Sequence, residues 1–123
     1  MQCLQSEYGY INELGMFFIP KSMQKESNFK PYSLEEDLVN LIDFEIEDNF
    51  IVLKHYKAIS RKEQSKMITD INNPNKMRSV DELGRVVIPK AYRKKSEITS
   101  MNILVIYLID KNTIKIRTLH DSQ

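Results

Sequence analysis

The chain contains one segment in two copies, and this repeat limits the folds that are open to it. The segment INELGMFFIPKSMQKES at residues 11–27 returns 69 positions later as VDELGRVVIPKAYRKKS at residues 80–96. Eight of the seventeen aligned positions are identical without a gap, whereas chance would give about one. The shared residues include Glu-Leu-Gly and Ile-Pro-Lys in both copies. The repeat indicates two copies of one small structural unit.

The length of the chain decides how the two copies combine. At 123 residues it can bury one compact core but is short for two independent domains. We therefore expect one fold in which residues 1–57 form a degenerate first copy and residues 77–118 form the second. Residues 58–76 between them are polar and end in Asn-Asn-Pro-Asn, which predicts a linker, with a helix in its first half as an option.

Each copy follows one plan: a short extended segment, a turn at Leu-Gly, a strand, a short helix and a hairpin. Proline fixes φ and cannot donate a ladder hydrogen bond, so strand should give way to helix at Pro20 and Pro89. Gly15 and Gly84 are expected to adopt positive φ at the turns. Hairpin strands are predicted at residues 44–47 and 50–54 in the first copy and at residues 103–109 and 113–118 in the second.

Alternation along the predicted strands indicates which side chains face a core. Ile114 and Ile116 alternate with Lys115 and Arg117, so the two isoleucines should be buried. One of two adjacent residues, Phe17 and Phe18, should point inward and the other outward.

The first copy is longer than the second between its Ile-Pro-Lys segment and its hairpin. The surplus contains Ser-Leu-Glu-Glu at residues 33–36, which is typical of a capping box that starts a helical turn. Leu34, Leu38 and Leu41 would share one face of such a helix. The same stretch could instead enter the first hairpin strand early, and the sequence leaves both readings open.

Neither copy has enough strands to cover both faces of its own sheet. We therefore expect the copies to intertwine into one mainly β barrel with short helices and a pseudo-twofold axis. Pairing of the second copy with the second copy of another chain is the competing assembly, and the sequence does not decide between them.

Charge separates the two halves of the chain. Residues 1–60 hold five Lys or Arg and ten Asp or Glu, whereas residues 61–123 hold thirteen and seven. Such asymmetry is typical of nucleic-acid binding by the basic half, although a solvated basic surface would have the same composition.

Other classes of protein find little support in the sequence. A single cysteine, Cys3, excludes an internal disulfide and fits a reducing compartment. The longest apolar stretch, residues 101–109, is too short to cross a bilayer, and the N-terminus has no signal peptide, so we expect a soluble cytoplasmic protein with no membrane association. His55 and His120 are isolated and no catalytic motif is present, so we expect no enzyme, no metal and no cofactor.

The segment MRSVDELGRVVIPKAYRKK at residues 77–95 resembles the DNA-binding domain of the AbrB and SpoVT transition-state regulators, a group that includes MazE-like and MraZ-like proteins. In that family two units exchange hairpins into a swapped-hairpin β-barrel whose loops and short helices face DNA. The resemblance covers residues 77–118 well and residues 3–57 more weakly. It implies an intrachain pseudo-dimer of two AbrB-like repeats, similar to the tandem organisation of MraZ, that acts as a sequence-specific, double-stranded DNA-binding transcriptional regulator.

The family's DNA contacts fall on basic residues of the second copy. The resemblance implies such contacts at Arg78, Arg85, Arg93 and Lys94. Because Lys90, Arg93 and Lys94 have helical spacing, they should share one face of a helix, and Lys95 extends the basic run. The positions in the first copy that match the four implied contacts hold Gly9, Met16, Gln24 and Lys25. Only one charge is kept there, so the resemblance does not extend to symmetric recognition of a two-fold DNA site.

Two further partners are compatible with this composition. A homodimer of the pseudo-dimer would restore two equivalent basic faces and raise affinity through avidity. The alternative function is a protein-interaction or antitoxin-like module in which the acidic first copy binds a basic protein partner. The acidic residues concerned are Glu35, Glu36, Asp37, Glu45 and Glu47.

Overall fold

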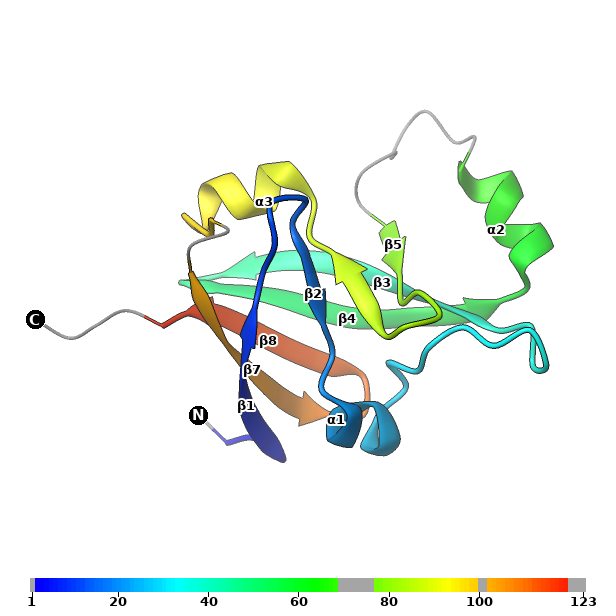
Figure 1. The fold of residues 1–123 in the computed structure, drawn as a ribbon, viewed down its shortest axis with the longest axis horizontal. Helices are drawn as coiled ribbons and strands as arrows, with labels where there is room; N and C mark the ends of the chain where they lie inside the picture. The colour runs from blue at the N-terminus through cyan, green and yellow to red at the C-terminus, as the bar shows by residue number, and fades with distance from the viewer. Residues whose placement is uncertain (1, 69–76, 100–101, 120–123) are drawn as a thin grey trace, which may run out of the picture.

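The computed structural model describes residues 2–68, 77–99 and 102–119 (Figure 1). Within them the protein is mainly β, with short helices, as expected. The strands are β1 (Gln5–Tyr10), β2 (Met16–Phe18), β3 (Val39–Glu47), β4 (Phe50–Ile59), β5 (Met77–Ser79), β6 (Arg85–Val87), β7 (Ile103–Asp110) and β8 (Thr113–Thr118). The helices are α1 (Lys21–Glu26), α2 (Arg61–Ile68) and α3 (Lys90–Lys95).

The strands form two antiparallel sheets. Six strands are ordered β1-β7-β8-β4-β3-β5, and β2 pairs with β6 in a separate two-stranded ribbon that lies in front of the larger sheet (Figure 1). The expected closed barrel does not form among the described strands, because β1 and β5 are the two edges of the larger sheet and are not bonded to each other. The chain turns away from each edge strand into the ribbon, which closes the core by side-chain packing instead of a continuous ladder.

Strands of the first copy pair with strands of the second copy in both sheets. β1 of the first copy pairs with β7 of the second, and β5 of the second copy pairs with β3 of the first. The ribbon β2–β6 and the ladder β4–β8 also join one copy to the other. The first strand of each copy therefore lies against the hairpin of the other, and neither copy has a complete sheet of its own.

One hydrophobic core draws on both copies. Phe17 of β2 lies opposite Val86 of β6, and both are buried in a cluster that includes Ile114 and Ile116. The predicted burial of the two isoleucines is confirmed, since each is fully buried. The prediction for the phenylalanine pair is also confirmed, because Phe17 is 0% exposed and Phe18 is 59% exposed.

The extra residues of the first copy form the predicted turn, which does not extend into a helix: the Ser33 hydroxyl accepts from the Glu36 amide at 3.3 Å, as in a capping box. The Asp37 amide donates to the Ser33 carbonyl at 2.8 Å, and Asp37 then adopts a φ of 51°, which ends the turn after one cycle. β3 begins at Val39, so both interpretations are correct in part: residues 33–37 form the capped turn, and the strand then begins earlier than residue 44. Leu41 is buried there in a small second cluster with Tyr32, Val39 and Ile59, because pairing with β4 and β5 outweighs the helical pattern.

The first two residues of the expected linker, 58 and 59, belong to β4, and a helix follows them. α2 lies in the first half of the linker, and Arg61 at the start of α2 lies 4.1 Å from the centre of the Tyr32 ring. The remainder, residues 69–76, lies outside the described residues, as does His120. No helix in the described part of the chain has the length and apolar character needed to cross a membrane.

Candidate nucleic-acid interface

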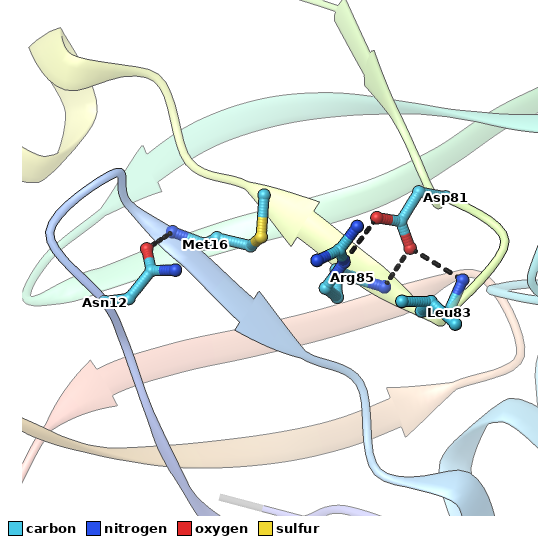
Figure 2. Close-up of polar contacts among 5 residues, drawn as sticks. All are labelled: Asn12, Met16, Asp81, Leu83 and Arg85. Carbon is cyan, nitrogen blue, oxygen red and sulfur yellow. Dashed lines mark hydrogen bonds and ion pairs between the residues drawn. The ribbon is translucent and has the colours of Figure 1, made fainter.

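Two loops with the same hydrogen bonds lead into the ribbon. The side-chain oxygen of Asn12 accepts from the amides of Leu14 and Met16 at 3.0 and 2.9 Å. The Oδ1 atom of Asp81 accepts from the amides of Leu83 and Arg85 at 2.9 and 2.7 Å. Asn and Asp favour such turns because their short side chains mimic a backbone acceptor. Figure 2 places these loops at opposite ends of the ribbon, which we call the Asn12 end and the Asp81 end.

A glycine in each loop allows the two copies to interlock. Gly15 and Gly84 have φ values of 84° and 81°, which confirms the expected positive φ at both turns. The Gly15 carbonyl accepts from the Ile88 amide at 2.8 Å, and the Gly84 carbonyl accepts from the Ile19 amide at 2.9 Å. Each loop therefore accepts a hydrogen bond from the residue that directly follows the ribbon strand of the other copy.

The short helix of each copy lies at the loop of the other copy. Arg93 of α3 donates from Nε to the Ile88 carbonyl at 3.0 Å, and its guanidinium lies against Gly15. Gln24 of α1 donates from Nε2 to the Ile19 carbonyl at 2.7 Å, and its amide lies against Gly84. As a result, α3 occupies the Asn12 end of the ribbon and α1 the Asp81 end (Figure 1).

The expected DNA contacts divide between the two ends. Arg85 opens β6 at the Asp81 end, where it lies opposite Phe18. Arg78 is partly buried in the neighbouring strand β5, opposite Ile42 of β3. At the Asn12 end, α3 presents three exposed lysines, Lys90, Lys94 and Lys95. The second copy therefore supplies cations to both ends of the ribbon, not to a single patch.

Arg93 departs from the predicted basic face of α3. It is partly buried, and its Nε is bonded to the Ile88 carbonyl, whereas Lys90 and Lys94 are exposed. The reason lies in the other copy, because Gly15 has no side chain and leaves room for the guanidinium to pack over it. The helical spacing alone would have placed the three cations together.

Arg85 is held by an acidic neighbour. Its Nε lies 2.6 Å from Oδ2 of Asp81, and the two side chains are 33% and 34% exposed (Figure 2). In the first copy Asn12 occupies the place of Asp81 and Met16 that of Arg85, so this ion pair has no counterpart there. The first copy adds positive charge near the Asp81 end, because α1 carries two exposed lysines, Lys21 and Lys25.

The outward face of the ribbon is apolar between these charged ends. Phe18 is 59% exposed, and Met16 and Val87 are partly exposed on the same face. The loop residues Leu14 and Leu83 are 69% and 59% exposed at the two ends. The site thus combines a narrow two-stranded ribbon, apolar contacts along its length and cations at each end.

Three of the five acidic residues expected to bind a protein make contacts within the chain, whereas Glu35 and Glu36 are exposed. Glu45 pairs with Lys54 at 3.2 Å, and Glu47 pairs with Lys115 at 2.9 Å. The hydrogen bond from Lys115, aided by its charge, holds the pKa of Glu47 below its usual value. Asp37 accepts from the Tyr32 hydroxyl at 3.1 Å and from the Arg61 amide at 3.2 Å.

His55 has a structural environment. Asn40 donates from Nδ2 to the Lys30 carbonyl at 2.9 Å, which turns its oxygen toward Nε2 of His55, also at 2.9 Å. The ring meets the edge of Phe29, and burial lowers the pKa of His55 below its usual value. Across the described ranges, no three His, Cys, Asp or Glu side chains group as a metal site requires.

Sequence reasoning did not single out three residues that shape this interface. Asn12 and Asp81 organise the loops, and Gln24 positions α1 against Gly84. A signal for the first two was present, since Asn or Asp stands three residues before glycine in both copies, as an Asx turn would place it. The role of Gln24 had no local signal because its contact with Gly84 comes from the other copy.

Comparison with known proteins adds little to this description. No family model and no curated protein matches the chain. A solution structure of PHS018 from Pyrococcus horikoshii is similar over 97% of this chain and 92% of that chain, at 18% sequence identity and a TM-score of 0.37. A score of that size does not establish a shared fold.

Proposed function

We propose that this protein is a duplex DNA-binding transcriptional regulator of the AbrB type, a swapped-hairpin pseudo-dimer within one chain. The reciprocal pairing supports the proposal, because the first strand of each copy lies on the hairpin of the other. The Glu-Leu-Gly and Ile-Pro-Lys segments, shared by both copies, form the turns and helix starts around the ribbon. In this proposal the protein binds and does not catalyse.

The observation that carries the proposal is the presence of cations at both ends of a two-stranded ribbon. The major groove of DNA admits a ribbon of this kind, and its walls are lined by phosphates. Arg85 and Lys25 at the Asp81 end, with Lys94 at the Asn12 end, would contact phosphates on either side. Phe18 and Val87 between them would lie against base edges, where thymine offers a methyl group.

Removing one cation from each end, the partly exposed Arg85 and the exposed Lys94, tests this function. We expect Arg85→Ala with Lys94→Ala to weaken binding to mixed-sequence duplexes by at least about tenfold near physiological salt, measured by fluorescence anisotropy. The slope of log K against log salt should fall in magnitude by about 2, because two phosphate contacts are lost. Arg93 is left intact because its contacts with Ile88 and Gly15 stabilise the fold.

The matched control is Lys62→Ala, which removes an exposed lysine from α2, away from the ribbon (Figure 1). It should leave affinity nearly unchanged. If the double variant and the control bind alike, or if the wild-type protein fails to bind duplexes at low salt, the ribbon is not a DNA-binding surface.

Asp81→Asn should strengthen duplex binding. An asparagine in this position can keep both amide bonds, as Asn12 does in the first copy, while the ion pair with Arg85 is lost. Because exposed ion pairs contribute little, stability should change by less than about 1 kcal/mol. Removing the negative charge and releasing Arg85 should raise affinity severalfold in the same anisotropy assay.

Asp81→Ala is the control, since it also loses the turn bonds and should destabilise the protein by about 2 kcal/mol. An unchanged or weaker affinity for Asp81→Asn would place Arg85 outside the interface.

A further inference from the structure

The six-stranded sheet has an outward face that the proposed DNA interface does not use. Gly9 and Glu7 of β1 point to the core side, because a Cβ on Gly9 would meet Ile106 and Glu7 accepts from Ser22 of α1 at 2.9 Å. Side chains alternate along a strand, so Tyr8 and Tyr10 point to the opposite side. They are 69% and 75% exposed.

Cross-strand pairing places basic and aromatic side chains on the same face as these tyrosines. Tyr8 lies opposite Val105 of β7, which lies opposite Arg117 of β8. In the next row Tyr107 of β7 lies opposite Lys115 of β8. We call this surface the tyrosine face, and it consists of Tyr8, Tyr10, Phe50, Tyr107, Lys115 and Arg117.

The interior part of the tyrosine face is held in place by its own contacts. Arg117 donates from Nε to the Tyr107 hydroxyl at 3.0 Å, with its guanidinium carbon 5.7 Å from the ring centre. Phe50 meets Tyr107 edge to face at 6.1 Å between ring centres, and Lys115 lies 5.6 Å from the Phe50 ring centre. The rings and cations therefore form a fixed platform, with two exposed tyrosines along its edge.

The charge of the tyrosine face favours an anionic ligand. The outward positions of β1, β7 and β8 are residues 6, 8 and 10, residues 103, 105 and 107, and residues 113, 115 and 117. They include Lys115 and Arg117 and no Asp or Glu, but Glu47 of β3 pairs with Lys115 at 2.9 Å, so Lys115, Arg117 and Glu47 together carry a charge of +1. Two rings at alternate positions of one strand stand about 7 Å apart, which leaves room for a separate base on each ring.

We propose that the tyrosine face binds single-stranded nucleic acid. Bases stack on Tyr8 and Tyr10, and the phosphates between them lie toward Arg117, as on other sheet surfaces that combine aromatic rings with cations. Such binding tolerates sequence, because every base has a face that can stack. This surface is independent of the ribbon, so it does not rest on the proposed duplex binding.

The test compares oligonucleotides with and without bases. The probes are oligo(dT) and oligo(U) of about twelve nucleotides and an abasic oligomer of equal charge, labelled for anisotropy at low salt. The chain has six tyrosines and no tryptophan, so stacking should also quench its tyrosine emission. We expect both base-containing probes to bind and quench, and the abasic probe to bind at least about tenfold more weakly.

Paired variants locate the site. Tyr8→Ala with Tyr10→Ala should weaken oligo(dT) binding by at least about tenfold, whereas Tyr8→Phe with Tyr10→Phe should keep it, because the rings remain. The alanine pair should bind duplex DNA as the wild type does, and Arg85→Ala with Lys94→Ala should bind oligo(dT) as the wild type does.

Three results would overturn the proposal. One is equal binding of the abasic and base-containing probes, and another is unchanged oligo(dT) affinity in the alanine pair. The third is a wild-type dimer that becomes a monomer in the alanine pair on size-exclusion chromatography, which would assign the face to a second copy of this chain.

Discussion

Phe17→Ala is expected to lower the free energy of unfolding by about 3–5 kcal/mol, the range for removing a fully buried aromatic side chain. Phe17 is 0% exposed and lies opposite Val86, where the ribbon of both copies closes the core. The cavity would therefore affect both copies together. Urea denaturation followed by circular dichroism should show one transition, shifted to lower denaturant concentration, because the two copies share one core.

Phe18→Ala is the matched control for this prediction. The same side chain is removed from the next position of the same strand, but Phe18 is 59% exposed, so the loss should stay below about 1 kcal/mol. Similar losses for the two variants, or a second transition in either one, would contradict the shared core closed by the ribbon.

Gly15→Ala is expected to destabilise the protein by about 2–3 kcal/mol. A side chain at a φ of 84° costs about 1–2 kcal/mol. The new methyl would also overlap Arg93 along its length, from Cδ through Nε to Cζ, and disturb the bond from Nε to the Ile88 carbonyl, which adds about 1 kcal/mol. Thermal and urea unfolding would measure the total.

Two comparisons separate these contributions. Introduced into Arg93→Ala, the same substitution should cost only the backbone strain, so a double-mutant cycle should show a coupling of about 1 kcal/mol. Gly84→Ala should cost less than Gly15→Ala, because its methyl would overlap only the terminal nitrogen of Gln24, and rotation of that amide gives up a neutral hydrogen bond to the Ile19 carbonyl, which is weaker than the charged one made by Arg93. No coupling with Arg93, or a larger cost at Gly84, would show that the packing of Arg93 against Gly15 contributes little.

Local chemistry was sufficient to predict the elements of this fold. Side-chain and backbone preferences within a few residues predict three kinds of element: the glycine turns at Gly15 and Gly84, the helix starts after Pro20 and Pro89, and the second hairpin. The first copy was harder, because residues 33–42 fit a helical turn and the start of a strand. Both form: residues 33–37 make the capped turn, and pairing with β4 and β5 places the residues from Val39 onward in β3.

The arrangement of charge was decided by the tertiary structure alone. In the sequence, the six predicted DNA contacts all belong to the second copy, which suggests a single basic surface. They are Arg78, Arg85, Lys90, Arg93, Lys94 and Lys95. In the fold, α3 lies at the loop of the other copy, so these cations separate to two ends of a ribbon and Arg93 is used to pack against Gly15. Residue spacing predicts which side chains are neighbours within one helix or strand. The contacts that separate these cations, such as Arg93 against Gly15 and Arg85 opposite Phe18, join residues more than 60 positions apart. The sequence therefore determined which units form, and the pairing of strands between copies determined where their charges lie.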